Sequence, residues 1–482
     1  MECIDETITY RQIPFEKQSM TDSQKTFSPI DGSVYVERPY ADAEHRRLVL
    51  ERAANAQAAW KNVPLTERKA LCSRATESFV ANKESIAHEL CWQMGRPIRY
   101  AVNEVGSFAD RSHFMISVAD VALAPVQVSD KAGFIRYISR EPVGVVLVIA
   151  PWNFPLHTPI NAIIPALLAG NTVILKHSAQ TPLCAERIYE AFQAAGLPEG
   201  VFQYLHMSHE GTESVIRSPQ INFVAFTGSV SAGAKVEQAA AGRFIGVGLE
   251  LGGKDPAYVR ADADLDYAVE TTVDGAFFNS GQSCCGIERI YVHESIFDIY
   301  VEQFVALVKQ YRLGRSDDPE TTLGPMVRTS AATFVRSQID EAVDQGAIAH
   351  VDPESFPLDQ PDSPYMAPQV LTQVDHSMRV MTEESFGPVV GIMKVSSDAE
   401  ALQLMNDSEF GLTAAIFTQD IDTAIVLGQQ LETGTFFVNR CDFLDPELAW
   451  TGVKNSGRGC TLSKLGFDAF TRPKSFHIKT NL

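Results

Sequence analysis

The central part of the chain alternates between continuous apolar runs and segments in which apolar residues recur at helical spacing. The run VGVVLVIA covers residues 143–150, and a second run, TVILK, covers 172–176. Continuous β-branched runs of this length are typical of strands buried on both faces. The segment INAIIPALLAG between them predicts a helix, and VFQYL and NFVAFTG predict two further strands. This alternation predicts a doubly wound parallel sheet, an architecture that binds nucleotides.

The segments on either side of this sheet follow other patterns. From Ala41 to Trp60 the apolar spacing is helical, and more helical segments follow. The stretch from Gln127 to Gly144 alternates and contains an Ala-Gly turn, which predicts a β-hairpin. Thr181 precedes Pro182, so a helix capped by Thr181 is predicted to begin there. After about Gly253 helices and strands alternate again, which predicts a second α/β domain.

The composition argues against several classes of protein. The chain has 60 acidic and 40 basic residues and a formal net charge of −20, which disfavours binding to nucleic acid or anionic lipid. No apolar run is long enough to cross a bilayer, and the segment MECIDETITY matches neither a secretory signal nor a transit peptide. The cysteines show no zinc-type spacing. We therefore predict a cytoplasmic protein without a metal, membrane or nucleic-acid partner.

Two loops carry candidate chemistry. In FTGSVSAG, Gly228 permits a tight turn and Ser229 offers a hydroxyl and a helix amino-terminal amide, which suits a pyrophosphate. The same pattern also fits an ordinary strand-to-helix turn. In FFNSGQSCC, Cys284 and Cys285 follow a Gly-Gln-Ser turn and precede a segment that we predict to be helical. That setting favours a reactive thiolate, although a single cysteine is more often a packing residue.

Four motifs, in this order, connect the chain to a known family. They are APWNFP at 150–155, LELGGKDP at 249–256, FFNSGQSC at 277–284 and ESFGPV at 384–389. Together they resemble the aldehyde dehydrogenase superfamily. The resemblance extends from SPIDG, which begins at residue 28, to RPKS, which ends at residue 475.

The resemblance implies a chemical role for three residues. Cys284, the second residue after the Gly-Gln pair, would attack the aldehyde carbon, with Cys285 as a structural neighbour. Asn153 and the Cys284 amide would bind the oxyanion. Glu250 would activate the water that hydrolyses the thioester. Acyl-transferring relatives generally lack this glutamate, and an inactive structural relative would lack Cys284 or Glu250, so we expect hydrolysis to a free acid.

The resemblance also implies a site for NAD or NADP. The positions that match cofactor-binding residues are Trp152, Lys176, Ser178, Ala179, Gly228, Ser229, Leu251, Glu384 and Phe386. NAD-preferring relatives often carry a glutamate at the position of Ala179, where a carboxylate repels a 2′-phosphate. We therefore predict that NADP is accepted, with Lys176 and Ser178 around the phosphate and His177 as a further candidate.

The substrate is less well defined. The residues expected to line its tunnel are Phe154, His157, Asn161, Phe278, Phe443 and Trp450. None is basic, which favours an uncharged aliphatic or aromatic aldehyde. The alternative is an acidic semialdehyde, for which Arg440 or Arg458 would have to reach the site. The chain departs from the common pattern at Asn161-Ala162, where many relatives carry Trp-Lys, and at Cys460-Thr461, where Arg-Glu is common.

We therefore predict an α/β fold with three parts. A doubly wound cofactor domain comprises residues 1–120 and 141–252, and a second α/β catalytic domain comprises 253–450. A small β element at 121–140 and 470–482 matches the oligomerisation element of the family. In relatives its hairpin adds strands to a partner's sheet, so a homodimer or homotetramer is expected, with a small aldehyde as substrate.

Overall fold

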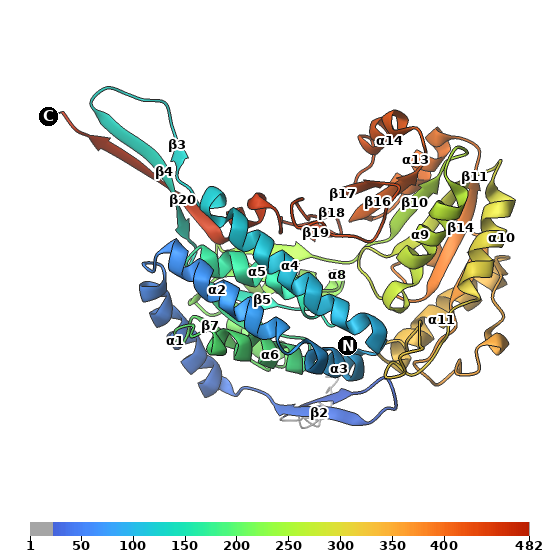
Figure 1. Cartoon of the computed structure of the whole chain (residues 1–482), viewed down its shortest axis with the longest axis horizontal. Coiled ribbons are helices and arrows are strands. Elements are labelled where there is room, and N and C mark those ends of the chain that lie inside the picture. Colours follow the sequence, from blue (N-terminus) through green and yellow to red (C-terminus); the bar gives the residue numbers. More distant parts are fainter. Residues whose placement is uncertain (1–22, 482) are drawn as a thin grey trace, which may run out of the picture.

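The computed structural model describes residues 23–481. The segment MECIDETITY, for which we predict neither a signal nor a transit peptide, lies outside the described residues. Figure 1 shows two α/β bodies side by side and a β-arm that projects from one of them. Within residues 23–481 no helix is long and apolar enough to span a membrane.

A six-stranded sheet with the order β19-β9-β8-β5-β6-β7 forms the first body. Its strands are β5 (Val145–Ile149), β6 (Thr172–Lys176), β7 (Phe202–Tyr204), β8 (Ile221–Thr227), β9 (Gly246–Glu250) and β19 (Gly457–Arg458). Strands β5 to β9 are parallel, and only β19 runs antiparallel to its neighbour. This is a doubly wound sheet, so the predicted fold and its four predicted strands are confirmed.

Helices cover both faces of this sheet. They are α1 (Ala43–Trp60), α2 (Leu65–Val80), α3 (Lys83–Met94), α4 (Ile98–Ala122), α5 (His157–Leu168), α6 (Pro182–Ala194), α7 (His209–Ile216) and α8 (Val230–Ala240). Val146 and Val148 of β5 pack with α2 to α6, whereas Val145, Leu147 and Ile149 pack with α1, α7 and α8. Burial on both faces explains why the sequence of β5 is continuously apolar.

The second body contains a seven-stranded sheet with the order β12-β13-β14-β11-β10-β16-β17. Its strands are β10 (Asp255–Val259), β11 (Ile287–His293), β12 (Ile348–Ala349), β13 (Gln369–Thr372), β14 (Val389–Val395), β16 (Thr413–Phe417) and β17 (Thr435–Val438). Its helices are α9 (Leu265–Phe277), α10 (Phe297–Val308), α11 (Thr329–Asp344), α12 (Arg379–Thr382), α13 (Asp398–Asn406) and α14 (Ile421–Gly428). All its strand pairs are parallel except β12 with β13.

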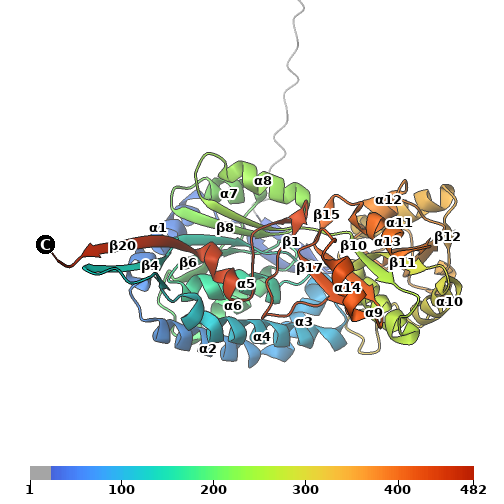
Figure 2. The ribbon, with the colours of Figure 1, turned by 90° about the horizontal axis from the view of Figure 1, so that it is seen from above.

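The projecting arm is a three-stranded antiparallel sheet in the order β20-β4-β3. Strand β4 (Phe134–Pro142) pairs with β3 (Val126–Gln127) through the predicted hairpin turn and with β20 (Thr471–Lys479) along its whole length. Figure 2, seen from above, shows the arm extending away from the body. The remaining elements are β1 (Ser23–Phe27), β2 (Val34–Pro39), β15 (Phe410–Gly411), β18 (Val453–Lys454) and the short 3₁₀ segments η1 (Phe278–Gly281), η2 (Pro353–Ser355) and η3 (Lys464–Phe470).

Two local predictions are wrong. The segment after Cys285 is strand β11 and not a helix, because it lies in the middle of the second sheet, between β10 and β14. Helix α6 does begin at Pro182, but Thr181 makes no capping hydrogen bond. Its hydroxyl lies 3.1 Å from His177 Nδ1 instead.

Candidate active site

A cavity of about 1330 Å³ opens at the carboxyl ends of the strands in the first sheet, facing the second body. Parallel strands place the segments that follow them at one edge, and β5 and β8 are neighbours at the point where the strand order reverses. All predicted catalytic, cofactor and substrate residues line this cavity except Ala179. The sequence motifs therefore converge in space, although the role of each residue stays a prediction.

The loop that carries Cys284 is tightly constrained. After α9 the chain passes through three residues with left-handed backbone, Asn279 (φ 52°), Ser280 (φ 57°) and Gly281 (φ 70°). A Cβ atom at Gly281 would lie 2.1 Å from the Gly387 carbonyl oxygen, so only glycine fits there. Left-handed backbone at a non-glycine residue costs about 1–3 kcal/mol. The surrounding contacts must hold this conformation, and they leave Cys284 half-buried at the cavity wall.

Cys284 and Cys285 occupy different environments. Cys285 is buried, and its Sγ donates to Asp442 Oδ1 at 3.0 Å. Ser283 Oγ donates to the same oxygen at 2.9 Å. The hydrogen bond with Cys284, together with burial, raises the pKa of the Cys285 thiol well above its ordinary value. The geometry therefore makes Cys285 a poor nucleophile and leaves Cys284 as the accessible thiol.

A buried ion pair supports the segment that carries Asn153. Arg96 pairs with Glu104, donates to the Asn153 carbonyl oxygen at 2.6 Å and donates to Asn279 Oδ1 at 3.1 Å. Asn153 Nδ2 donates to the Gln282 carbonyl oxygen at 3.2 Å. One guanidinium thus connects the loop after β5 to the cysteine loop, which fixes the amide of Asn153 relative to Cys284.

Glu250 is the last residue of β9 and lies opposite Gly457 of β19. Its carboxylate accepts hydrogen bonds from Thr461 Oγ1 and, at 3.3 Å, from Thr227 Oγ1. Burial raises the pKa of this carboxyl above its ordinary value, and the two hydroxyls oppose that rise. Thr461 was not among the predicted site residues, because its contact with Glu250 depends on the pairing of β19 with β9.

The cofactor side of the cavity contains a buried ammonium group. Lys176 ends β6, is 9% exposed and forms no ion pair within residues 23–481. Burial lowers its pKa to about 8. Lys235 and His209, which the sequence interpretation missed, line the same part of the cavity. Burial and the charges of Lys176 and Lys235 lower the pKa of His209, so both lysines act on this part of the cavity, which Glu210 and Glu213 also line.

Two predictions about the loop after β6 need correction. Ala179 does not line the cavity, and its carbonyl oxygen accepts a hydrogen bond from Thr26 Oγ1 at 2.8 Å. His177 is 2% exposed and lies 2.8 Å from the Pro155 carbonyl oxygen, so it is not free to bind a phosphate. Burial lowers its pKa to about 4 and keeps the ring neutral.

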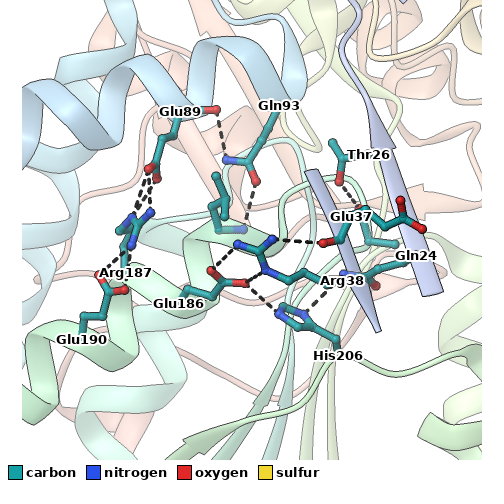
Figure 3. A network of polar contacts seen from close by, with 12 residues as sticks. Gln24, Thr26, Glu37, Arg38, Glu89, Gln93, Glu186, Arg187, Glu190 and His206 are labelled. Atoms are coloured by element: carbon teal, nitrogen blue, oxygen red, sulfur yellow. Dashed lines mark hydrogen bonds and ion pairs between the residues drawn. The ribbon is translucent and has the colours of Figure 1, made fainter. Parts of the chain in front are cut away.

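A network of polar contacts joins the loop after β6 and helix α6 to the antiparallel pair of strands β1 and β2 (Figure 3). Arg38 of β2 forms a bidentate pair with Glu186 of α6, at 2.7 and 3.0 Å. His206 lies 3.0 Å from the same carboxylate. Although burial opposes it, hydrogen bonds from His206 and Arg38 lower the pKa of Glu186 to about 2. Together with Thr26, these contacts hold β1 and β2 on the segment that carries Lys176 and Ser178.

The segment with Glu384 and Phe386 is held from the second body. Glu288 pairs with buried Lys254 and accepts hydrogen bonds from the backbone amides of Ser385 and Phe386, both at 2.8 Å. The Gly253 amide donates to Glu384 Oε1 at 3.0 Å. Burial, followed by the charge of Glu288, raises the pKa of Glu384 to about 8. Within residues 23–481 no cluster of three or more His, Cys, Asp or Glu side chains is arranged to hold a metal ion.

The predicted substrate residues form a partly aromatic wall. Phe154 stacks on His157 at 5.0 Å and lies 6.4 Å from Phe278, measured between ring centroids. Phe443 is covered by the Arg440 guanidinium, 3.5 Å from its ring centroid. Arg440 does not line the cavity, nor does Arg458, which pairs with Glu237 instead.

The expectation that no basic residue lines the substrate side is wrong. Arg111 of α4 lines the cavity and is 6% exposed. Its Nη1 donates to Asn161 Oδ1 at 3.2 Å and to the His157 carbonyl oxygen at 3.3 Å. Burial lowers its pKa to about 10, so it remains a cation at neutral pH. A signal was present: Glu104 and Arg111, seven residues apart, are charged residues on the buried face of α4.

Known proteins match this chain over most of its length. The model of the family described as "Aldehyde dehydrogenase family" matches residues 15–476. The chain is 35% identical to succinate semialdehyde dehydrogenase [NAD(P)+] Sad of Escherichia coli, over 92% of this chain and 96% of that protein. It is 33% identical to succinate-semialdehyde dehydrogenase [NADP(+)] of Deinococcus radiodurans, over 93% of each. The structure of NADP-dependent glyceraldehyde-3-phosphate dehydrogenase from Bacillus halodurans complexed with NADP superimposes with a TM-score of 0.89, at 32% identity over 95% of this chain and 96% of that one.

Proposed function

The chain belongs to the aldehyde dehydrogenase family and oxidises an aldehyde with NAD(P)+, and on this premise we propose that its substrate is a semialdehyde, an aldehyde that also carries a carboxylate. The observation that supports this proposal is the state of Arg111. Within residues 23–481 no carboxylate lies within 4.0 Å of its guanidinium, and its Nε and Nη2 form no hydrogen bond. The charges of Glu250 and Glu104 act on Arg111 without forming an ion pair, and a buried cation that lacks a close anionic partner is costly, so this site favours an anion.

Other groups around Arg111 support the same assignment. His157 Nδ1 is buried without a hydrogen-bond partner, and burial, followed by the charges of Arg111 and Arg96, lowers the pKa of the ring well below its ordinary value. A neutral imidazole can donate one further hydrogen bond to a carboxylate. Two similar proteins are named succinate semialdehyde dehydrogenases, and succinate semialdehyde is an aldehyde that carries a carboxylate. The aromatic side chains of Phe154 and Phe278 favour the second candidate, an uncharged aldehyde.

The reaction that we assign to the site begins at Cys284. Its thiolate adds to the aldehyde carbon, while the Asn153 amide and the Cys284 backbone N–H stabilise the oxyanion; loss of one such donor costs about 100–1000-fold in rate. NAD(P)+, when bound, supplies the hydride acceptor. Cys284 then holds the acyl group as a thioester. Glu250 takes a proton from water, and the water releases the carboxylic acid and regenerates the thiolate.

The cofactor side fits an anionic dinucleotide. Lys176 is a buried ammonium without a carboxylate partner, and Ser229 caps the amino terminus of α8, where backbone amides favour phosphate. We assign the adenosine end to Lys176 and Ser178, the pyrophosphate to Gly228, Ser229 and Trp152, and the nicotinamide end to Leu251, Glu384 and Phe386. Lys235 lines the same cavity and acts with Lys176 on His209, and this additional cation supports the use of NADP. Ala179 acts only by lacking a carboxylate, since it does not reach the cavity.

The substrate proposal is tested by comparing matched aldehydes. We expect kcat/KM for succinate semialdehyde to exceed that for butanal at least about 30-fold, because the lost charge-assisted contact is worth about 2 kcal/mol or more. Both oxidised cofactors are used in turn, and NADP is expected to support turnover. Equal or better use of butanal and benzaldehyde would favour the uncharged substrate and contradict the assignment of Arg111.

We propose that the chain has three parts: a cofactor domain (1–120 and 141–252), a catalytic domain (253–450) and the arm (121–140 and 470–482). We also propose that two or four chains assemble through the arm. Each of the two large sheets has its own core, which supports two domains. Ile135 and Ile478 pair across β4 and β20 and are 53% and 44% exposed. On α14, Ile421, Ile425 and Val426 are exposed as well. Two apolar surfaces of this kind fit burial against a second copy of the chain.

The assembly is tested by sedimentation of the purified protein. We expect a mass of at least twice the 52.9 kDa of one chain. The double variant Ile135→Asp/Ile478→Asp should sediment as a monomer, because it places two charges on the apolar face of the arm. Val343→Asp, at an exposed valine of α11 outside residues 121–140 and 470–482, is the control and should leave the assembly unchanged. A wild-type monomer would contradict the proposal.

A further inference from the structure

The segment from Trp450 to Thr461 fixes one side chain against Glu250. Gly457 pairs with Glu250, and the Ser456 carbonyl oxygen accepts from the Leu251 amide at 3.0 Å. Four residues later the backbone of Thr461 pairs with that of Trp450 through two hydrogen bonds of 2.9 Å. The Thr461 hydroxyl is thereby directed at Glu250 Oε1, to which it donates.

We propose that Thr461 is a positioning residue for the general base: its hydroxyl orients the Glu250 carboxylate and favours its ionised form during hydrolysis of the thioester. This inference rests on the proposed role of Glu250 as that base. At residues 460–461 this chain has Cys-Thr where Arg-Glu is common in similar proteins. The inference gives the threonine of this pair a function.

The hydrogen-bond geometry supports the positioning role of Thr461. A hydroxyl that donates to a carboxylate stabilises the anion, and a charge-assisted bond of this kind is stronger than a neutral one. Thr227 Oγ1 donates to the other oxygen at 3.3 Å, which is a longer and weaker contact. With both oxygens bonded, the orientation of the carboxylate is defined before a water molecule arrives.

Several other groups act on the same carboxylate. The charge of Arg111, from α4, lowers the pKa of Glu250, and burial opposes it as the largest influence. The thiols of Cys284 and Cys285 face Arg111 from the cysteine loop, and Cys460 lies next to Thr461 and feels the charge of Glu250. Since Arg111 remains unchanged in a Thr461 variant, the contribution of the hydroxyl can be measured separately.

The test is Thr461→Val, which keeps the shape and the backbone pairing and removes only the hydroxyl. The water-activating step should slow about 10–100-fold, the loss expected for one hydrogen bond to a charged group. Hydride transfer should be unaffected, so rapid mixing with an aldehyde that gives turnover should produce a burst of one NAD(P)H per site. Thr461→Ser should restore the wild-type behaviour. Thr451→Val is the control, because the Thr451 hydroxyl donates to the Gly459 carbonyl oxygen and not to Glu250.

The pH profile supplies a second readout. Glu250 accepts a proton only when it is ionised, so kcat falls as the pH falls through its pKa. Removal of a donor to the carboxylate raises that pKa, so the acid limb of the Thr461→Val profile should move to higher pH. An equal loss in hydride transfer and hydrolysis, without a shift of the limb, would show a merely structural role and overturn the inference.

Glu250→Gln separates this inference from the proposed function. If Glu250→Gln hydrolyses its thioester at the wild-type rate, the assignment of Glu250 as the base is wrong, and the inference is overturned with it. If Glu250→Gln accumulates the thioester and Thr461→Val behaves as wild type, only the positioning role is overturned. Accumulation in both variants, with the shifted limb in Thr461→Val, supports both.

Discussion

Cys284→Ala is expected to lower kcat/KM at least about 1000-fold with every aldehyde, whereas Cys285→Ala should change it only several-fold. A nucleophile that forms the covalent intermediate cannot be replaced by its neighbour, and loss of such a residue costs several orders of magnitude. Cys284 lies half-buried at the cavity wall, whereas the Cys285 thiol is bonded to Asp442. NAD(P)H formation by the purified variants measures both effects.

Cofactor binding provides the control for this comparison. Both variants should bind NADP as the wild type does, because neither cysteine is among the residues that we assign to the cofactor. Cys285→Ala leaves Asp442 with the Ser283 hydroxyl as donor, so a loss of stability of about 1 kcal/mol is expected from the missing hydrogen bond. Full activity in Cys284→Ala, or complete loss in Cys285→Ala alone, would reverse the assignment of the nucleophile.

The order of cysteine alkylation gives an independent check. Iodoacetamide under mild conditions should modify Cys284 before Cys285, since Cys285 is buried and hydrogen bonding with burial raises the pKa of its thiol. Peptide mapping identifies the modified residue. Saturating NADP is expected to change the rate of this modification, because the cofactor shares the cavity with Cys284.

Local sequence patterns predict those parts of the fold in which burial is uniform. Strands β5 and β6 are apolar on both faces, and their continuous runs reveal them directly. The motifs around Asn153, Glu250 and Cys284 meet at one cavity because each lies at the end of a strand. Asn153 follows β5, Glu250 is the last residue of β9, and Cys284 precedes β11 of the second body. The position of the site therefore follows from the order of the motifs.

Side-chain surroundings that depend on distant segments were not predictable in the same way. His177 stands next to Lys176 in a loop, yet it is buried because Pro155 and Thr181 close around it. The segment after Cys285 forms a strand because β10 and β14 lie on either side of it. Thr461 reaches Glu250 only through the pairing of β19 with β9. In each case the surroundings of the residue are set by tertiary packing, which a local sequence pattern does not show.

Arg111 shows the functional consequence of this limit. From the sequence it is one charged residue in a long helix, and the predicted tunnel therefore lacked a cation. In the structure it lines the cavity and donates hydrogen bonds to His157 and Asn161, the two polar residues of the predicted wall. A buried guanidinium changes the expected substrate, because an uncharged aldehyde would leave it without an anionic partner.

Arg111→Met is accordingly expected to lower kcat/KM for succinate semialdehyde about 30–5000-fold while changing that for butanal no more than several-fold. Truncation of one partner of a buried charge pair costs about 2–5 kcal/mol, and that pair would exist only with an acidic substrate. The effect should be mainly on KM, since the contact with the carboxylate is the same before and after the aldehyde carbon reacts. Steady-state kinetics with both aldehydes measure the ratio.

The stability of the variant distinguishes substrate binding from helix packing. If the guanidinium mainly joined α4 to α5, its removal would destabilise the protein and reduce activity with both aldehydes equally, and the proposed role would be wrong. If it awaits an anion, the relief of removing a buried charge that has no close carboxylate offsets the loss of the two Nη1 hydrogen bonds, so Arg111→Met should unfold within about 1 kcal/mol of the wild type. Succinate should inhibit the wild type competitively and this variant far more weakly. Arg440→Met, which removes a cation that lies outside the cavity, should retain the wild-type preference for the acidic aldehyde.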